Sequence, residues 1–536
     1  MSILNMITSY AGSQFLPFYI TVFILTLVPW VIRFSWPELR KGSEVPLANP
    51  PESLFGTGKT RRNFVKLSRE ILAKARSLFP DEPFRLITDW GEVLILPPDF
   101  ADEIRNDPRL SFSKAAMQGD NVLQDNHAGI PGFETVALVG REDQLIQKVA
   151  RKQLTKHLLS LNFGETTGKS PFRAHQSGAI TNRPKNTEWR AIRLKPAILD
   201  IIARISSRIY LGDQLCRNEA WLKITKTYTT NFYTASTNLR MFPRSIRPLA
   251  HWFLPECRKL RQERKDAVGI ITPLIERRRE LRRAAAAAGQ PLPVFHDAID
   301  WSEQEAEAAG SGPAFDPVIF QLTLSLLAIH TTYDLLQQTM IDLGRHPEYI
   351  EPLRQEVVQL LREEGWKKTT LFKMKLLDSA IKESQRMKPG SIVTMRRYVT
   401  EDITLSSGLT LKRGTRLNVD NRRLDDPKIY EKPEVYNPYR FYDMRSEAGK
   451  DHGAQLVSTG SNHMGFGHGQ HSCPGRFFAA NEIKVALCHI LVKYDWKLCP
   501  DTETKPDTRG MIAKSSPVTD ILIKRRESVE LDLEAI

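Results

Sequence analysis

The stretch Phe466-Gly467-His468-Gly469-Gln470-His471-Ser472-Cys473-Pro474-Gly475-Arg476 decides the interpretation of this 536-residue chain. Gly467 and Gly469 allow a tight backbone that a large planar cofactor could approach. Pro474 is acceptable at a helix start because its missing N–H is not needed there, so the pattern places Cys473 at a helix N-terminus. The unpaired N–H groups and the dipole of such an end favour a thiolate over a thiol. A thiolate is a strong axial donor to haem iron.

Three other interpretations of this loop are open. A single buried cysteine is usually a small hydrophobic residue. The Gly-x-Gly-x-Gly pattern over 465–469 suggests a nucleotide loop, but that motif would need a further glycine at 470 or 472, and neither position has one. A zinc site is a third possibility, although the spacing of its candidate ligands matches no usual zinc pattern. Those ligands are His463, His468, His471 and Cys473.

The loop closely resembles the FxxGxxxCxG haem loop of the cytochrome P-450 superfamily. Phe466, Gly469, Cys473 and Gly475 occupy its four fixed positions. The resemblance implies that the Cys473 thiolate is the iron ligand of haem b. It also implies that Phe466 packs beside the thiolate and that His471 hydrogen-bonds a haem propionate.

A second resemblance lies upstream of the cysteine. Glu383 and Arg386 form an ExxR pair whose spacing puts both side chains on one helix face. Several other ExxR matches occur in the chain, and this one is selected by its distance from Cys473 and by the PxRF-like segment Pro438-Tyr439-Arg440-Phe441. The family would use Glu383, Arg386 and Arg440 as a buried structural triad behind the haem. An exposed pair that contributes little is the alternative.

Two further arginines match positions that bind the haem propionates in the family. Arg397 begins a strand-like segment, and Arg151 lies on an amphipathic segment that starts at Asp143. The family often has tryptophan four residues before the second arginine, where this chain has Gln147.

The segment Ala328-Ile329-His330-Thr331-Thr332 resembles the oxygen-activating stretch of the family, usually [AG]GxxTT with an acid before the threonines. Thr331, followed by Thr332, would bend its helix by bonding backward and help to deliver protons to oxygen. His330 replaces the usual acid, and histidine can relay protons near neutral pH. The alternative is a core-facing helix whose threonines only satisfy the backbone.

The N-terminal segment indicates a membrane anchor. Residues 1–32 contain no charged side chain, and 15–32 are mostly apolar, which as a helix would span about 27 Å. Basic residues follow the apolar run and favour a lumenal N-terminus with a cytosolic body. We therefore expect one transmembrane helix within 1–35, a proline-rich linker over 36–55 and a catalytic domain over 56–536. A cleavable signal peptide, which would need a basic start that is absent here, and a buried core helix are the alternatives.

Hydrophobic periodicity predicts a mainly α fold with small β-sheets, and the resemblance specifies the cytochrome P-450 fold. Polar and glycine-rich segments predict an exposed loop over 164–186 and a mobile connection over 289–312. Helices are expected at 70–78, 143–159, 254–288, 318–343, 347–364, 376–387 and 477–494, and strands at 85–96, 391–399 and 409–419.

Charge and cysteine content limit the partners. The formal net charge of +14 comes from widely spread Lys and Arg, so we expect no nucleic acid. Five irregularly spaced cysteines suit a reducing compartment better than a disulfide framework. No flavin or nicotinamide fingerprint is present, so electrons would come from a partner, and the family resemblance implies that this partner is the membrane-bound NADPH–haemoprotein reductase. A basic face around the haem would attract the acidic surface of that partner.

Together these features imply a haem-thiolate monooxygenase of the endoplasmic reticulum membrane. Five residues expected to line the pocket (Leu324, Leu327, Ile392, Val393 and Met395) favour an apolar, polycyclic ligand. The phrases at 77–80, 84–86 and 328–332 resemble the filamentous-fungal group that includes ent-kaurene oxidase, which tailors terpenoids and meroterpenoids. Two alternatives are a haem-thiolate isomerase or dehydratase that uses no O₂, and a membrane haem-binding protein without turnover.

Overall fold

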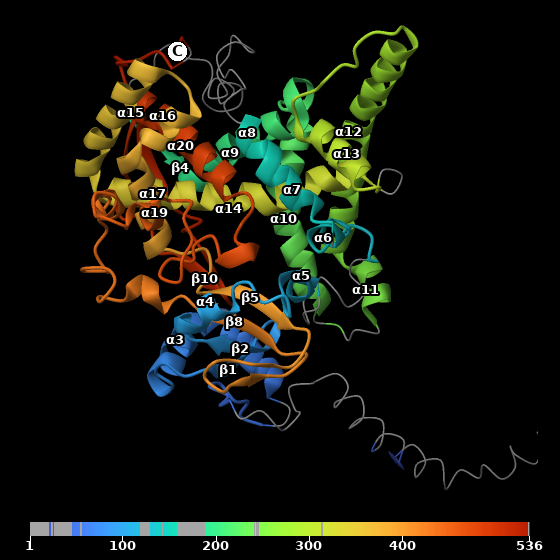
Figure 1. Ribbon diagram of the computed structural model, residues 1–536, viewed down its shortest axis with the longest axis vertical. Helices are drawn as coiled ribbons and strands as arrows, with labels where there is room; N and C mark the ends of the chain where they lie inside the picture. Colours follow the sequence, from blue (N-terminus) through green and yellow to red (C-terminus); the bar gives the residue numbers. More distant parts are fainter. Residues whose placement is uncertain are drawn as a thin grey trace, which may run out of the picture.

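The computed structural model describes residues 21, 22, 25, 45–53, 56–117, 129–141, 143–157, 188–240, 242, 246–311, 315–533 and 535–536. Within these residues, most helices fill one end of the molecule and the largest β-sheet lies at the other, while β4 (Arg190–Arg193) lies among the helices (Figure 1). This arrangement agrees with the predicted mainly α fold. The expected membrane anchor over 1–35, apart from three residues, and the loop expected over 164–186 lie outside the described residues.

One long helix, α14 (Pro317–Arg345), crosses the middle of the helical part (Figure 1). Asp316 caps its start by accepting hydrogen bonds from the N–H groups of Val318 and Ile319, and Pro317 follows at the first helical position. It is the one helix of the described chain that is long and apolar enough to span a membrane, but 72% of its apolar window is buried inside the protein. It is therefore a core helix.

Five other long helices contact α14 and build the core around it. The helices predicted at 318–343, 376–387 and 477–494 are confirmed within two residues at each end. Two of the five, α9 (Leu194–Leu215) and α10 (Glu219–Arg240), lie where the sequence predicted no helix or strand. The five are α9 (Leu194–Leu215), α10 (Glu219–Arg240), α12 (Pro255–Ala287), α17 (Lys375–Met387) and α20 (Arg476–Lys493).

The segment 289–312, expected to be a mobile connection, contains the helix α13 (Ala298–Ala308). Its acidic residues make the difference, because they pair with the basic helix α12 instead of facing water. Asp297 caps α13 by accepting from the N–H of Asp300, and it also accepts from the buried Arg278 at 2.9 Å. Arg279 pairs with Glu303 at 2.7 Å. The prediction of a mobile connection is wrong for this part of the segment.

The largest sheet has five strands in the order β1-β2-β8-β5-β3, with β2 and β8 parallel and the other pairs antiparallel. The segment 409–419, predicted as one strand, is divided by a turn at Gly414 into the short β7 (Thr410–Leu411) and β8. The strands of the large sheet are β1 (Phe84–Thr88), β2 (Gly91–Leu96), β3 (Leu110–Ser111), β5 (Val393–Val399) and β8 (Arg416–Asp420).

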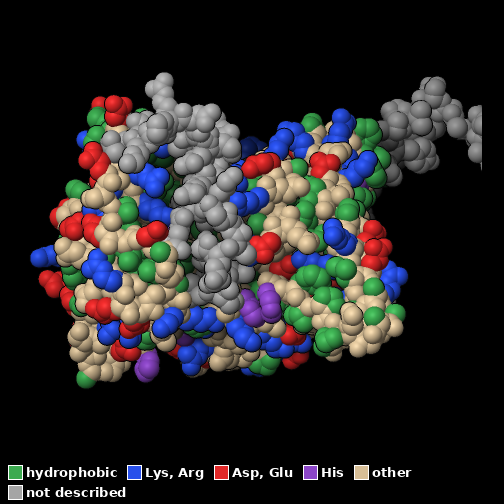
Figure 2. Space-filling view, turned by 90° about the horizontal axis from the view of Figure 1, so that it is seen from above, with side chains coloured by type: hydrophobic (Ala, Val, Ile, Leu, Met, Phe, Trp, Pro, Cys, Tyr) green, Lys and Arg blue, Asp and Glu red, His purple; other side chains and the backbone are tan. Residues whose placement is uncertain are grey.

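Surface charge is mixed on the face that Figure 2 presents. Lys and Arg side chains are interspersed there with Asp and Glu, although the chain carries a formal net charge of +14.

Helix α20 contains a fully buried carboxyl group. Glu482 accepts a hydrogen bond of 2.6 Å from the hydroxyl of Ser206 on α9. Burial raises the pKa of Glu482 from its ordinary value of 4.5 to about 8. The folded protein therefore holds this proton at pH values where the unfolded chain has already released it.

We expect the Glu482→Gln substitution to remove a pH dependence of stability. Between pH 4.5 and about 8, unfolding of the natural protein releases the Glu482 proton, so its stability falls as pH rises, by up to about 1.4 kcal/mol per pH unit. The thermal unfolding midpoint, measured at pH 5.5 and 7.5, should therefore differ less in the variant than in the natural protein. Glu527→Gln, at an exposed glutamate, is the control, and an equal pH dependence in all three proteins would contradict the prediction.

Candidate active site

The cysteine loop is held by its own backbone. The N–H of Cys473 donates to the carbonyl of Phe466 at 2.8 Å, and the N–H of Ser472 donates to Gly469 at 3.0 Å. Gly469 has a φ of +75°, and a Cβ there would lie 2.6 Å from Cβ of Arg105. The sequence suggested that this glycine admits a cofactor. The structure shows that it also leaves room for the backbone and side chain of Arg105, which pack against the loop.

The chemistry of the thiol differs from the expectation based on the helix end. The cysteine precedes α20, which begins at Arg476 with Gly475 as its N-cap. Burial raises the pKa of the Cys473 thiol, and hydrogen bonds from the N–H groups of Gly475 and Arg476 only partly oppose this rise. The loop by itself therefore favours a thiol. A bound metal ion reverses this preference, because a coordinating thiol is deprotonated.

The structure brings Glu383, Arg386 and Arg440 together. Arg386 donates twice to Glu383, both at 2.8 Å, and Arg440 donates to the same carboxylate at 3.0 Å. The side chains of Glu383 and Arg386 are completely buried. The remaining donors of Arg386 reach the carbonyls of Leu424 and Pro433 at 2.7 Å. The triad thus ties α17 to two segments between the sheet and the cysteine loop.

The residues expected to hold the haem propionates form a basic cluster. Burial, together with the charges of Arg397 and Arg151, lowers the pKa of His471 to about 4. Two side-chain nitrogens of Arg397, Nε and Nη2, are buried and have no hydrogen-bond partner among the described residues. Burial lowers the pKa of Arg397 to about 10. These two buried donors of Arg397 fit an anionic group such as a propionate of haem.

Arg151 reaches the cysteine loop from the amphipathic segment that the sequence predicted as one helix. That segment consists of α7 (Leu145–Val149), a π-helical turn (Ala150–Leu154) and α8 (Thr155–His157). Nη2 of Arg151 donates to the carbonyl of Gln470 at 3.5 Å. π-Helical turns frequently occur at functional sites, and this one places Arg151 beside His471.

One face of α14 is open although the helix is otherwise buried. Leu327 is 40% exposed and Thr331, one turn later, is exposed too, whereas almost every other residue from Pro317 to Leu343 is buried. The hydroxyl of Thr331 donates backward to the carbonyls of Leu327 and Ala328, at 3.0 and 3.1 Å. The buried hydroxyl of Thr332 has no partner among the described residues. The open face is where a cofactor and a substrate would fit.

His330 occupies a different environment from the one that its expected role requires. Its Nε2 lies 3.1 Å from the carbonyl of Lys226 on α10 and donates to it. Burial lowers the pKa of His330 to about 4, so the imidazole is neutral at neutral pH. The structure therefore joins His330 to α10, and the residue does not titrate near pH 7 as the sequence suggested.

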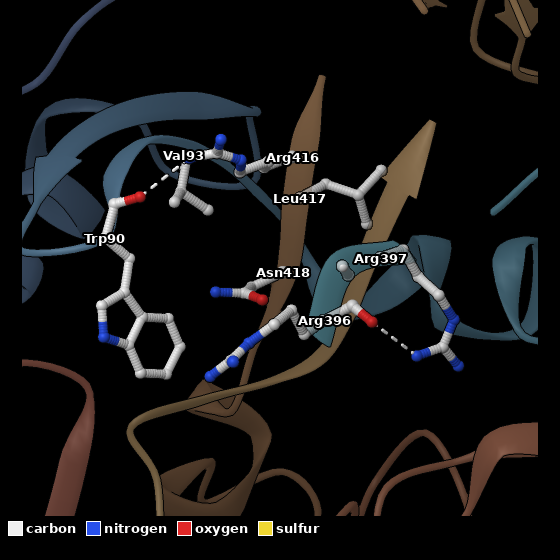
Figure 3. Close-up of a pocket in the computed structure, with 8 residues that line it drawn as sticks. Trp90, Val93, Arg396, Arg397, Arg416, Leu417 and Asn418 are labelled. Carbon is white, nitrogen blue, oxygen red and sulfur yellow. Dashed lines mark hydrogen bonds between the residues drawn. The ribbon is translucent and has the colours of Figure 1, made fainter. Parts of the chain in front are cut away.

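The expected apolar lining is largely packed into the protein. Of the five candidates only Leu327 faces open space, while Leu324, Ile392, Val393 and Met395 are buried in hydrophobic clusters. A polar residue that was not singled out, Arg396, lines a small pocket with about 10 Å³ of room instead (Figure 3). The sequence signal for this residue was the pair of adjacent arginines, because the propionate motif accounts for Arg397 and leaves Arg396 unexplained.

The fold and the site define a haem-thiolate enzyme, and comparison with known proteins agrees. A family model described as Cytochrome P450 matches residues 148–523. The chain therefore belongs to the cytochrome P450 family. It is a monooxygenase that binds haem b through a cysteine thiolate and takes NAD(P)H-derived electrons through a reductase.

Several fungal proteins are similar to the whole chain. "Cytochrome P450 monooygenase 2" of Gibberella fujikuroi is 86% identical over 536 residues, which is 100% of both chains. Cytochrome P450 monooxygenase hepE of Aspergillus oryzae is 40% identical and covers 94% of this chain and 89% of its own length. A structure of retinoic acid-bound cyanobacterial CYP120A1 superimposes with a TM-score of 0.58 at 16% identity, over 90% of this chain and 100% of the other. That last likeness shows the fold.

Proposed function

We propose that this enzyme oxidises an apolar, polycyclic secondary metabolite of terpenoid or meroterpenoid type, with O₂ and electrons from an NADPH–haemoprotein reductase. The observation that carries the proposal is the open face of α14, where Leu327 and Thr331 are exposed inside a buried helix. The similarity to fungal P450 monooxygenases supports it. Substrate size and polarity would be set by the side chains that surround this open face.

Each site residue has a proposed role. Cys473 would hold the iron, with Phe466, Gly469 and Gly475 shaping its loop, and haem b bound there would supply reductive activation of O₂ for attack on a C–H bond. Arg397, Arg151 and His471 would surround the propionates. Thr331 would hold a proton at Oγ1 beside the substrate. Glu383, Arg386 and Arg440 would keep the region behind the haem rigid.

The proposed location is the endoplasmic reticulum membrane, with an anchor over 1–35, a linker over 36–55 and a cytosolic domain over 56–536. A patch on the short helix α11 (Arg247–Phe253) supports contact between the domain and a membrane. Leu249, Trp252 and Phe253 are all more than half exposed there. Aromatic and aliphatic side chains exposed together are typical of membrane and protein contact sites.

Turnover of the reconstituted enzyme tests the proposed function. The full-length protein is combined with the reductase, NADPH and a panel of terpenoids, and NADPH oxidation, O₂ uptake and product are measured together. We expect a product that contains one oxygen atom from O₂. Conversion without O₂ uptake would indicate the isomerase or dehydratase, and ligand binding without any product would indicate a haem-binding protein without turnover.

The Thr331→Ala substitution should separate electron consumption from product formation. The variant loses the hydroxyl that faces the open side of α14, and with it a group that can hold or pass a proton. We expect product formed per NADPH oxidised to fall by at least about tenfold, while NADPH oxidation continues. Thr331→Ser keeps the hydroxyl and should keep most of the product. An unchanged ratio in Thr331→Ala would exclude this role.

A further inference from the structure

The cysteine loop contains a short turn whose capping group comes from a distant part of the chain. Gly469–His471 form a single 3₁₀ turn, and the residue before it, His468, makes no capping hydrogen bond with its side chain. The N–H of Gln470, the second residue of the turn, donates instead to Oδ1 of Asn106 at 2.8 Å. A side-chain oxygen that accepts from the second N–H of a helical turn acts as an N-cap. Asn106 therefore caps the cysteine loop from 364 positions earlier in the sequence.

Asn106 approaches the loop closely because residue 469 is glycine. A Cβ at position 469 would lie 2.8 Å from Oδ1 of Asn106 and 2.6 Å from the backbone carbonyl oxygen of Arg105. Gly469 also has a φ of +75°, which residues with a side chain rarely adopt. The same glycine thus allows the turn to form and leaves room for the residue that caps it.

Asn106 is one of three neighbouring residues that contact the loop from α4 (Ala101–Ile104) and the turn that follows it. Arg105 and Asn106 lie three and four residues after Asp102, a spacing that puts all three on one side of a helix. Nε2 of His468 donates to Oδ1 of Asp102 at 2.8 Å, and Nη1 of Arg105 lies 3.3 Å from the same nitrogen. Three successive loop residues, 468 to 470, are therefore held from one side.

α4 is itself fixed to the large sheet, and it lies between that sheet and the helical end of the molecule (Figure 1). Ala101 and Ile104 are almost completely buried in a hydrophobic cluster that includes residues of β2 and β8. The same cluster contains Met464, just before the cysteine loop. Glu103 accepts hydrogen bonds from the N–H and the hydroxyl of Ser406, at 2.7 and 2.9 Å. A capping residue next to such an anchored element has a defined position relative to the loop.

The capped turn leads directly to Cys473. The N–H of Ser472 donates to the carbonyl of Gly469 at 3.0 Å and closes the turn, and the N–H of Cys473 then donates to Phe466 at 2.8 Å. The carbonyl of Gln470 accepts from Arg151 at 3.5 Å. The conformation of residues 469–471 therefore determines where the sulfur of Cys473 lies, and loss of the cap would free the first part of the turn.

We propose that Asn106 is a positioning residue of the haem site. By capping the turn 469–471, it holds the cysteine loop in the conformation in which Cys473 binds iron. The inference rests on the proposed role of Cys473 and adds to that site a residue from outside the cysteine loop. Asn106 acts through the backbone N–H of Gln470 and needs no contact with haem or substrate.

The inference is tested by following the thiolate ligand and the fold separately in urea. The full-length holoenzyme is reduced under carbon monoxide at increasing urea concentrations. The ratio of the unshifted Soret band to the red-shifted band of thiolate-ligated haem is compared with far-ultraviolet circular dichroism of the same samples. For Asn106→Ala we expect this ratio to rise about fivefold at urea concentrations below the unfolding transition, the factor that corresponds to a typical lost cap. The circular dichroism midpoint should stay close to that of the natural protein, because Asn106 is exposed.

Two further variants identify the group responsible. Asn106→Asp keeps an oxygen that accepts the Gln470 N–H and should restore the ratio to within about twofold of the natural value. Asn63→Ala, at an exposed asparagine of α3 (Thr57–Leu78), is the matched control and should leave the ratio unchanged. An unchanged ratio in Asn106→Ala, no recovery in Asn106→Asp, or an equal change in Asn63→Ala would each overturn the inference. Parallel losses of the band and of circular dichroism would assign Asn106 to general stability and overturn it too.

Failure of the proposed function would be visible separately. If the natural holoenzyme shows no red-shifted band in the absence of urea, the assignment of Cys473 as the iron ligand fails. If the natural protein shows the band and Asn106→Ala loses it at the same urea concentrations, only the role of Asn106 fails.

Discussion

Replacing Cys473 with alanine is expected to abolish the red-shifted Soret band that a thiolate-ligated haem shows after reduction and binding of carbon monoxide. The thiolate is the electron donor that produces this shift, and alanine offers no replacement. The measurement is the reduced carbon-monoxide difference spectrum of the purified full-length protein. Monooxygenase activity should disappear with the band.

The fold should survive this substitution, because the loop is held by groups that alanine retains. The hydrogen bond from the Cys473 N–H to Phe466 uses the backbone alone. Far-ultraviolet circular dichroism should therefore be nearly unchanged. Cys499→Ala removes a thiol that is only partly buried and is the matched control, whose band should persist. An unchanged band in the Cys473 variant would mean that another residue holds the iron.

The Glu383→Gln substitution is expected to have the largest effect on stability. Glu383 is completely buried and accepts hydrogen bonds from both Arg386 and Arg440. Without its charge, two largely buried arginines would have no anionic partner in the triad, which costs about 3–5 kcal/mol. We expect a lower midpoint of urea unfolding and a lower ratio of haem to protein after purification.

A second ExxR pair in the same chain provides the control. Arg354 and Glu351 also lie three residues apart, but the Glu351 side chain is 55% exposed. Arg354 has further partners in Asp495 and the carbonyl of Leu491. We expect Glu351→Gln to change the free energy of unfolding by less than about 1 kcal/mol. Similar effects of the two substitutions would show that burial does not distinguish the two pairs.

Much of the fold and of the candidate site could be predicted because the signals are local. Asp316-Pro317 marks the start of α14, and the spacing of Glu383 and Arg386 puts both on one face of α17. The glycines at 467 and 469 indicate a tight loop, which their positive φ angles confirm. Each of these features depends on residues a few positions apart, so the sequence contains it completely.

The errors arose where distant segments meet. The acidic residues of α13 suggested a solvated connection, because their partners on α12 are some twenty residues earlier in the chain. His330 suggested a group that titrates near neutral pH, but its packing against α10 lowers its pKa to about 4. Four of the five expected lining residues proved to be core residues. Burial and charge pairing depend on contacts that no local pattern records.

Cys473 illustrates the division most clearly. The sequence by itself determined the family and the order of its motifs, and it predicts which residue would hold the iron, because those depend on residue type and spacing. Only the tertiary structure decided that burial raises the pKa of the Cys473 thiol, and that the register between β5 and β8 shifts between Thr394 and Arg397. Solvent exclusion and strand register are properties of the packed chain, so they follow from the whole fold rather than from any segment of it.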